Sequence, residues 1–246
     1  MMCKHFAALL LLAAASLSCK KQKVYDNPPA VLQVVNALED GVSLYANASG
    51  IHPIPYSHAL FIANKQFARM NFTGNIQPLA LYGTKDTLPE NKPVWARDLQ
   101  LEESKLYSLF LFGEKSKPGH LLIQNNFPPF ISGDSVTHVR FANMSNGQPV
   151  SINLKGNPAG SLLNNLAYKE VSAFTALNVD KSVSQYEFEF RDAATGALLG
   201  TFLAPFVNDY SLGSNVYLNM SWMLMLAGKP GGTGVNQLSI IKVDNR

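Results

Sequence analysis

The sequence predicts an all-β protein built as two tandem antiparallel β-sandwiches. Short segments with strand chemistry recur along the chain, and Gly, Pro, Asn and Asp stand between them. The spacing of apolar residues indicates no amphipathic helix of useful length. The order of segments in the first half returns in the second, and each half has the length of one sandwich, about 100 residues. This repetition favours a duplicated domain, and a single larger β-sandwich is the alternative.

In the first half, residues 106–113 are apolar on both faces, which is typical of a central strand. Residues 76–82 include Pro78, which has no N–H to donate to a neighbouring strand. This segment is therefore expected at a sheet edge. The predicted strands of the first half are residues 31–35, 41–45, 76–82, 94–101, 106–113 and 120–124.

The second half restates this order. Val42-Ser43-Leu44 corresponds to Val150-Ser151-Ile152, each placed shortly after an Asn and a Gly. Residues 186–191 alternate aromatic with charged side chains, which predicts a half-buried strand with one solvent-exposed face. Residues 194–196 then turn the chain into a hairpin. The predicted strands of the second half are residues 137–143, 150–155, 170–177, 186–191, 197–203, 215–227 and 237–243.

A Pro-rich linker separates the two predicted domains, which comprise residues 31–126 and 136–246. The linker, residues 127–135, contains Phe127-Pro128-Pro129-Phe130. This apolar segment is expected to pack between the two units, or to mark a surface for a partner.

The N-terminus has the features of a bacterial export signal. Lys4 supplies the positive start, and residues 6–17 form an apolar core of roughly 12 residues, shorter than the about 20 that span a bilayer. Ser16 and Ser18 are the small residues before the cleavage point. The segment ends in Cys19 and resembles the lipobox of bacterial lipoproteins, with Ser16 where that motif usually has Leu. An ordinary signal peptide with a chance cysteine is the alternative.

This resemblance implies that residues 1–18 are removed and that acyl chains on Cys19 hold the protein in a membrane. Residues 19–30 then form a tether, whose lysines lie at lipid headgroups or are simply solvated. Lys20 stands where an Asp would retain a lipoprotein in the inner membrane. The resemblance therefore favours the outer membrane of a Bacteroidetes-type cell envelope, and the leaflet stays open.

The composition limits which covalent links and which partners can be expected. Without residues 1–18, which include Cys3, the only cysteine is Cys19, so no disulfide is expected and each domain must be stable through its core. The formal charge of +3 falls to +2 when Lys4 is lost. A nearly neutral chain without a long basic patch offers little to nucleic acid, so none is expected as a partner.

Four stretches of the second unit share a further pattern: residues 166–174, 186–196, 216–218 and 226–228. In these stretches the second unit is similar to the domain of unknown function 4397 (DUF4397). The first unit matches more loosely, at residues 56–59 and 107–113, and Lys169 replaces the Gly that is usual after the family's tyrosine. The resemblance covers most of the mature chain, and it implies secreted Ig-like modules that are often repeated, often found in lipoproteins and without catalytic residues.

Patterns that carry catalysis or metal binding do not stand out. The sequence lacks the Gly-x-Ser-x-Gly motif of α/β-hydrolases. The acidic pairs at residues 102–103 and at Glu187 and Glu189 are adjacent or on a wet strand face, whereas a glycosidase needs two carboxylates across a cleft. His52 and His58 are close in sequence, but no Cys, Asp or Glu accompanies them, so neither a metal site nor a cofactor is predicted.

Three side chains are candidates for contact with sugars. Strand aromatics belong to the core by default. Trp95 opens a less apolar strand and is the candidate for stacking on a ligand. Asp86-Thr87-Leu88 and Asp134-Ser135-Val136 resemble the short O-glycosylation motif of Bacteroidetes envelope proteins, so Thr87 and Ser135 are candidate O-glycan sites. A three-residue pattern of this kind also arises by chance.

Together these observations predict a lipid-anchored cell-envelope protein with two Ig-like β-sandwiches after a lipoprotein signal peptide. It is expected to be a non-enzymatic structural or binding module for a glycan or an envelope protein. A hydrolase of envelope or dietary polymers is one alternative. An adhesion or pilus-like subunit is another, and it would require residues 31–35 to be a removable first strand. The oligomeric state stays open.

Overall fold

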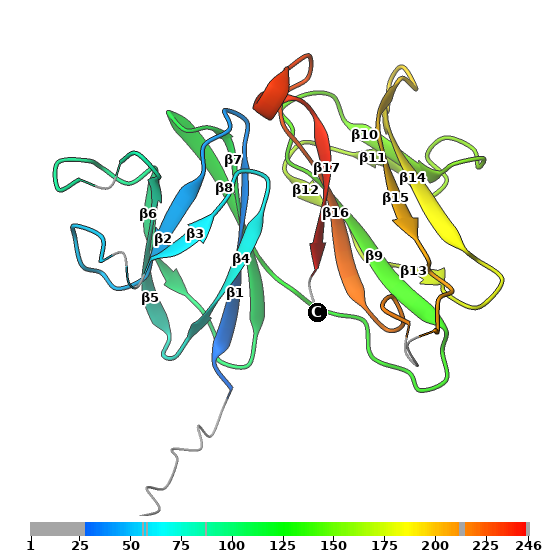
Figure 1. The fold of residues 1–246 in the computed structure, drawn as a ribbon, viewed down its shortest axis with the longest axis horizontal. Coiled ribbons are helices and arrows are strands. Elements are labelled where there is room, and N and C mark those ends of the chain that lie inside the picture. Colours follow the sequence, from blue (N-terminus) through cyan, green and yellow to red (C-terminus); the bar gives the residue numbers. More distant parts are fainter. Residues whose placement is uncertain (1–27, 56, 58, 87, 212–214, 245–246) are drawn as a thin grey trace, which may run out of the picture.

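The computed structural model describes residues 28–55, 57, 59–86, 88–211 and 215–244, and within them four β-sheets carry nearly all the regular structure (Figure 1). The predicted all-β class is confirmed. Helical structure among these residues is confined to 3-10 conformation, at Ser57 and in the short turn η2 (Gly234–Asn236). None of the described helical segments is long and apolar enough to cross a membrane.

Sheets A and B form the first sandwich. Their inward side chains make one apolar core, which includes Leu32 and Leu109 from sheet A and Leu81 and Leu99 from sheet B. Sheet A has the order β4 (Phe67–Phe72), β1 (Ala30–Leu38), β7 (Leu106–Glu114) and β8 (Lys117–Gln124). Sheet B has the order β3 (Leu60–Ile62), β2 (Leu44–Asn47), β5 (Ile76–Gly83) and β6 (Trp95–Gln100).

Sheets C and D form the second sandwich around a core that is rich in aromatic side chains, among them Phe141, Phe188 and Trp222. Sheet C has the order β12 (Glu170–Val171), β9 (Val136–Asn143), β16 (Ser221–Ala227) and β17 (Ser239–Asp244), with β13 (Thr175–Asn178) also paired to β9. Sheet D has the order β11 (Leu163–Leu166), β10 (Val150–Leu154), β14 (Gln185–Asp192) and β15 (Leu198–Pro205).

The two sandwiches share one topology, including a feature that the sequence did not indicate. Most strand pairs are antiparallel, but β1 pairs with β7 in parallel, and β9 pairs with β16 in parallel at the equivalent place. In both sandwiches the first strand and the penultimate strand therefore lie side by side in the centre of a sheet. The same arrangement in both halves is what a duplication predicts.

An asparagine near the end of the first strand of each sandwich, Asn36 in β1 and Asn143 in β9, organises the same corner. The Asn36 side chain donates to Val42 O (2.8 Å), and its own carbonyl accepts from Lys65 N (2.9 Å). The Asn143 side chain donates to Leu166 O (3.1 Å), and its carbonyl accepts from Lys169 N (2.8 Å). Both lysines have positive φ, 58° and 73°, so Lys169 adopts the backbone for which a Gly is favoured.

The predicted correspondence between the halves is displaced by two residues. Thr84 N donates to Ser43 O, and Ala193 N donates to Pro149 O in the equivalent place. Ser43 therefore matches Pro149 and not Ser151. The apolar residue types of β10 repeat every second position, so the sequence alone allowed the pattern to be matched one period too late.

The expected edge position of residues 76–82 is wrong, because β5 lies inside sheet B between β2 and β6. The reason is that β2 is short. Its last pair joins Asn47 to Ala80, so Pro78 lies beyond the end of β2 and faces only Asp98 of β6. A proline is tolerated there because no ladder on the β2 side is interrupted.

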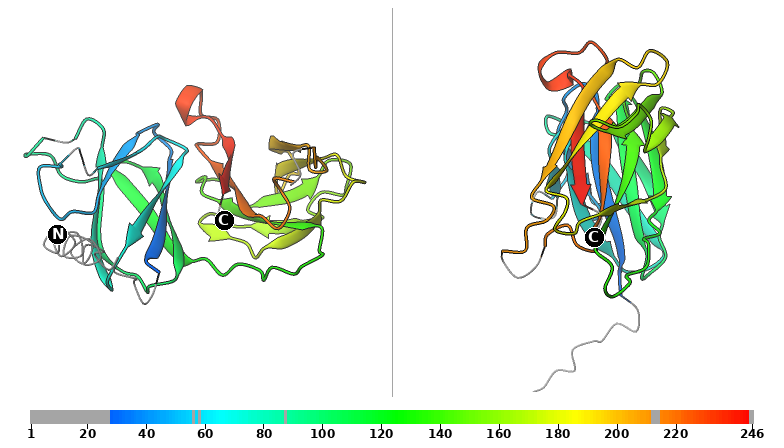
Figure 2. Two further views of the ribbon diagram at one scale, coloured as in Figure 1. Left: turned by 60° about the horizontal axis from the view of Figure 1, so that its bottom comes forward. Right: turned by 90° about the vertical axis from the view of Figure 1, so that its right-hand side faces the viewer.

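Sheets A and C pack face to face and create a third apolar core between the sandwiches. The layers therefore follow the order B, A, C, D (Figure 1). In the right-hand view of Figure 2, which looks onto the outer face of sheet D, the strands of both sandwiches run in nearly the same direction. The third core consists of Val35, Ala37, Phe110, Phe112, Ala142, Met144, Met223, Met225, Ala227, Ile241 and Val243.

This third core explains why β1, β7 and β16 are almost entirely apolar on both faces and why β9 is buried along most of its length. One face of each strand fills its own sandwich, and the other face fills the junction. Burying one Phe or Met side chain contributes roughly 1.5–3 kcal/mol, so the junction stabilises the protein on the scale of a domain core. The predicted central strand at residues 106–113 is thus central in its sheet and in the stack of layers.

Polar contacts close the junction at both ends. We call the end where β1, β7, β9 and β16 begin the proximal end, and the opposite one the distal end. At the proximal end Gln33 donates to Asp244 O (2.7 Å), and buried Arg140 donates to the Asn125 side chain (2.6 Å). Burial lowers the pKa of Arg140 to about 10, which leaves it charged at neutral pH, and its guanidinium lies 4.9 Å from the centre of the Phe174 ring.

The linker begins at the proximal end of the first sandwich, and only part of it packs between the two sandwiches as expected. Phe127 lies against Phe174 of the second sandwich, with 5.9 Å between ring centres, whereas Phe130 is exposed. Direct contact between sheets A and C fills the space in which the linker was expected.

A carboxyl group is buried at the distal end. Glu39 accepts a hydrogen bond from Asn146 N (3.1 Å) across the junction. Burial raises the pKa of Glu39; the Asn146 hydrogen bond and the charge of Lys229 oppose this rise, and the charges of Glu114 and Asp40 add to it. The ionised form of Glu39 therefore costs stability in the folded protein.

We predict that Glu39→Gln raises the free energy of unfolding at neutral pH, because glutamine keeps the acceptor and removes the buried charge. A raised folded-state pKa means that wild-type stability falls as pH rises through that pKa. The advantage of the variant should therefore shrink on acidification and vanish below about pH 4.3, the ordinary carboxyl pKa. Urea unfolding over a pH series measures this. Glu102→Gln, at an exposed carboxylate of the turn before β7, is the control that should show no such gain.

Candidate functional site

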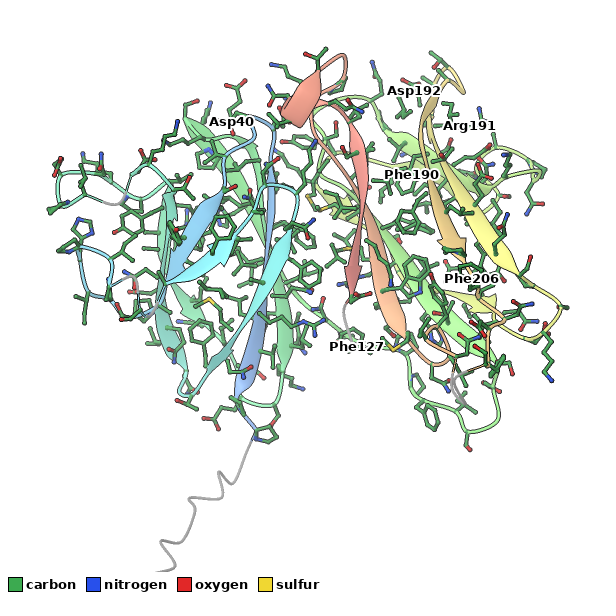
Figure 3. All side chains as sticks on the ribbon, viewed as in Figure 1. Asp40, Phe127, Phe190, Arg191, Asp192 and Phe206 are labelled. Carbon is green, nitrogen blue, oxygen red and sulfur yellow. The ribbon has the colours of Figure 1, made fainter. Side chains whose placement is uncertain are left out.

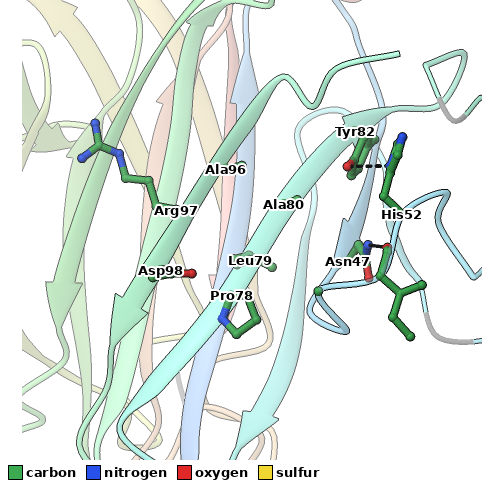
Figure 4. A pocket seen from close by; sticks show the side chains of 11 residues that line it. Asn47, His52, Pro78, Leu79, Ala80, Tyr82, Ala96, Arg97 and Asp98 are labelled. Carbon is green, nitrogen blue, oxygen red and sulfur yellow. Dashed lines mark hydrogen bonds between the residues drawn. The ribbon is translucent and has the colours of Figure 1, made fainter. Parts of the chain in front are cut away.

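The outer face of sheet B carries a groove whose floor is made of small side chains (Figure 4). Alternation along β5 points Pro78, Ala80 and Tyr82 away from the core. On β6 the outward residues opposite them are Asp98, paired with Pro78, and Ala96, paired with Ala80. Because these positions hold short side chains, the sheet surface is hollow there.

The segment after β2 forms one wall of this groove. The volume of the groove is about 300 Å³. Asn47 shapes the wall, because its side chain donates to Ile51 O (2.8 Å) and accepts from Ser49 N (3.1 Å). The lining residues are Asn47, Gly50, Ile51, His52, Pro78, Leu79, Ala80, Tyr82, Ala96, Arg97 and Asp98.

His52 ties this wall to the segment that joins β5 to β6. Its Nε2 lies 2.8 Å from Pro89 O, and its Nδ1 lies 3.0 Å from the Tyr82 hydroxyl (Figure 4). A carbonyl only accepts, so Nε2 carries the proton and Nδ1 accepts from Tyr82. The imidazole also stacks on the Tyr82 ring, with 5.5 Å between centres and 15° between planes.

An aromatic strip adjoins the groove and crosses sheet B. We use this name for Phe61, Tyr45, Tyr82 and His52. Phe61 pairs with Tyr45 across β3 and β2, and Tyr45 pairs with Tyr82 across β2 and β5, so the three rings share one face. The Phe61 and Tyr45 rings are 5.6 Å apart, and Phe61 is 52% exposed, whereas Tyr82 is 5% exposed. The strip therefore offers solvent the rings of Phe61 and half-buried Tyr45.

Asp98 is the carboxylic acid among the described residues that line the groove. It is exposed, and its carboxylate points over the floor toward Pro78 (Figure 4). Arg97, on the same strand, extends away from the groove in that view. The groove thus combines apolar floor, aromatic strip and one acceptor group, the combination found in small-molecule sites.

The second sandwich uses the equivalent face differently. The match between Ser43 and Pro149 aligns β5 of the first sandwich with β14 of the second. In this alignment Glu189 takes the place of Ala80. Arg191 takes the place of Tyr82. Arg191 points outward and Phe190 into the core (Figure 3). Arg191 pairs with Glu189 at 2.9 Å, and hydrogen bonds from Asn153 and then Arg191 lower the pKa of Glu189. Ion-paired side chains therefore fill the outer face of sheet D, whereas the equivalent face of sheet B is hollow.

Two further hollows are dominated by charged groups. One, of about 310 Å³ at the distal end of the first sandwich, contains the Asp86–Lys115 ion pair. Another, at the proximal end, is lined by Ile76 and by Glu102 and Glu103. Neither contains an aromatic residue, so the groove on sheet B is the best candidate for a ligand site.

The predicted ligand aromatic, Trp95, lies in the core of the first sandwich. It is 7% exposed, and its ring lies 5.4 Å from that of His120. The indole N–H has no hydrogen-bond partner among the described atoms. The expectation of a solvent-facing ring is therefore corrected: alternation on β6 turns Trp95 inward, together with Leu99.

The other predicted site residues are placed as follows. Ser135 is half-buried just before β9, and its carbonyl accepts from Val179 N (2.8 Å). Cys19, Thr87 and His58 lie outside the described residues, as does the signal peptide. Within the part of the chain that the structure describes, no three His, Cys, Asp or Glu side chains lie together as a metal site would require.

The sequence did not reveal the aromatic strip, because Tyr45, Phe61 and Tyr82 belong to three separate strands. Each could equally have been a core side chain. One signal was present in the sequence, because each of these two aromatic residues stands between two apolar residues that face the core. Tyr45 lies between Leu44 and Ala46. Phe61 lies between Leu60 and Ile62. That alternation points both aromatic rings outward.

No protein-family model and no curated protein sequence matches the chain. Solved structures with some similarity include the Bacillus anthracis TIE protein, at 9% identity and a TM-score of 0.25 over 82% of this chain. The chain spans 34% of the length of that protein. CBMbc (family CBM26) from Eubacterium rectale Amy13K, in complex with maltoheptaose, matches at 11% identity and a TM-score of 0.25, over 87% of this chain and 96% of its own.

The fimbrial anchor protein Mfa2 from Porphyromonas gingivalis matches at 12% identity and a TM-score of 0.23, over 87% of this chain and 95% of its own. Similarity at these TM-scores carries no argument. The fold described above rests on the chain's own strand pairing and cores.

We predict that His52→Ala loosens the wall of the groove, because the variant loses both hydrogen bonds and the stacked ring. Amides in residues 84–94 should exchange hydrogen faster, since Pro89 is no longer held. Stability should fall by about 1–2 kcal/mol, the scale of two partly exposed hydrogen bonds. Hydrogen exchange read by mass spectrometry checks this. His138→Ala, at a half-buried histidine of β9 in the second sandwich, is the control, and unchanged exchange in both variants would contradict the role given to His52.

Proposed function

We propose that this chain is a lipid-anchored, non-enzymatic module of the cell envelope that binds a glycan on the outer face of sheet B. The groove beside the aromatic strip carries this proposal. Sugar rings have apolar C–H faces and polar edges. An exposed aromatic ring suits the first, and the Asp98 carboxylate, which accepts hydrogen bonds from hydroxyls, suits the second.

The dimensions of the strip fit a short stretch of glycan chain. Tyr82 is 5% exposed and lies against the His52 ring, so the aromatic surface open to solvent is that of Phe61 and Tyr45, whose ring centres lie 5.6 Å apart. That length accommodates one sugar ring lying across β3 and β2. The groove over Pro78, Ala80 and Ala96 continues beyond Tyr82 and would receive further units.

The lining of the groove supports binding without turnover. Glycoside hydrolysis uses two carboxyl groups on either side of the scissile bond. Asp98 has no second Asp or Glu beside it among the described lining residues. The pairs considered from sequence lie elsewhere, with Glu187 in an ion pair with Lys155 (3.0 Å) on sheet D and Glu102 and Glu103 in a proximal turn.

The lipid anchor and the outer-membrane location remain proposals that rest on the lipobox-like segment ending at Cys19. The relation to DUF4397 likewise stays a prediction, supported by the shared corner at Asn36 and Asn143. A pilus-like role is less favoured. Its removable first strand would be β1, which lies between β4 and β7 and is buried on both faces.

We predict that Tyr45→Ala and Phe61→Ala each weaken glycan binding roughly tenfold, equivalent to about 1.4 kcal/mol, because each removes one stacking surface. Affinity electrophoresis in gels containing starch, xylan or lipopolysaccharide measures this as lost retardation. Leu203→Ala is the matched control, because Leu203 is 49% exposed on the outer face of sheet D. Retardation by none of these polymers, or equal retardation of all variants, would count against the proposal and would favour an envelope-protein partner.

We predict that Cys19→Ala transfers the protein from the membrane fraction to the soluble fraction, because no acyl chain can then be attached. Immunoblots of fractionated cells check this. Ser18→Ala keeps a small residue before the cleavage point and should stay membrane-bound. A Cys19→Ala protein that remains in the membrane fraction would refute the anchor.

A further inference from the structure

Exposed apolar side chains gather at the proximal end. This end is defined by chain topology: β5, β9 and β16 begin here and β15 ends here, and the linker between the sandwiches crosses it (Figure 1). None of these residues belongs to the groove on sheet B. The exposed large apolar residues at this end are Ile76, Phe130, Ile131, Phe206 and Val216.

Phe206 is the most unusual of them. It follows β15, is 70% exposed and has φ of 57°, a region that bulky residues seldom adopt (Figure 3). Its neighbour Val207 is fully buried and donates from its N–H to Ser184 O (3.1 Å). The backbone is thus fixed directly beside Phe206, and it holds the ring out in solvent. Strain of this kind without burial is a reason to look for a role.

The linker and the segment around Phe206 are attached to one another through a single residue. Val179 N donates to Ser135 O (2.8 Å), and Val179 O accepts from the Tyr210 hydroxyl (3.1 Å). Both segments thus belong to the proximal end of the second sandwich. We call their four exposed apolar residues, Phe130, Ile131, Phe206 and Val216, the proximal apolar tip.

The chain enters the fold at this same end. Pro28, the first described residue, accepts a hydrogen bond from Ser104 N (2.8 Å) in the turn before β7. Cys19 lies nine positions earlier, since 28 minus 19 is 9, and nine extended residues reach at most about 30 Å. An acyl chain on Cys19 would keep the proximal end, and not the distal end, next to the bilayer.

We propose that the proximal apolar tip inserts into the surface of the bilayer that holds the lipid anchor, an inference that rests on the anchor under Proposed function. The charges nearby select the kind of lipid. Asp134 and Asp209 stand three residues from Ile131 and Phe206, and Asp180 and Lys181 follow Val179. Apart from the lysines of the tether, this excess of carboxylates gives the tip no attraction to an anionic surface. The tip therefore fits a zwitterionic lipid surface, which Phe and Ile enter by apolar contact.

This contact would set the orientation of the whole molecule. With both the tether and the tip at the membrane, the strands stand upright on it. The third core keeps the two sandwiches in one rigid arrangement, so the outer face of sheet B then points sideways along the membrane. A glycan in the groove would be reached laterally.

Phe206→Trp in the full, lipidated protein tests this contact. The variant is reconstituted into phosphatidylcholine vesicles whose acyl chains carry bromine, a short-range quencher of indole emission. The indole introduced at position 206 should lose emission in brominated vesicles relative to plain ones. The native Trp95 and Trp222 are buried and supply a constant background. The control is Leu198→Trp, at the exposed start of β15 and hence at the distal end, and it should keep its emission.

The outcomes separate the tip from the anchor. Flotation of the protein with the vesicles, together with quenching of the Phe206→Trp variant alone, supports the proposal. Flotation in which the Phe206→Trp variant is quenched no more than the Leu198→Trp variant overturns the contact and leaves the anchor standing. A protein that does not float overturns both.

Discussion

Sheets A and C each bury side chains on two faces, and the rest of the molecule depends on that double burial. One face of β1, β7, β9 and β16 fills a sandwich and the other fills the junction, so β1, β7 and β16 consist of apolar residues almost throughout and β9 is buried along most of its length. A sheet buried on both sides has no wet face, and its strands cannot show a period of two. The junction leaves only the outer faces of sheets B and D, and the two ends of the molecule, for contact with anything else.

The two sandwiches share one topology, and the difference between their outer faces is where function is sought. The corner that Asn36 and Asn143 organise is the same in both halves, because it determines how the first strand turns into the second sheet. The outer faces carry no such constraint. Sheet D is covered by ion pairs around Glu189, whereas sheet B has Ala80 and Tyr82 in the matching places. Short side chains beside exposed rings create a hollow that ion-paired long side chains would fill.

The sequence predicted the class of fold and most strands, because strand composition and turn residues are local properties. It also indicated the repetition and the central position of residues 106–113. It misplaced what depends on partners. Pro78 suggested an edge strand, but the early end of β2 lets β5 lie inside the sheet. Trp95 was expected to face a ligand, but its place in the alternation of β6 turns it into the core. Neither outcome can be derived without knowing the neighbouring strand and its register.

What the sequence determined by itself is therefore the local chemistry of the chain: an export segment that ends in Cys19, strand-forming segments, turns and an all-β class. What only the tertiary structure decided is which faces meet. The packing of sheet A on sheet C, the aromatic strip of Phe61, Tyr45 and Tyr82, and the gathering of Phe130 and Phe206 at one end all join residues far apart in sequence. Register and layer packing bring them together, and both follow from the burial of apolar surface summed over the whole chain, which no single segment encodes.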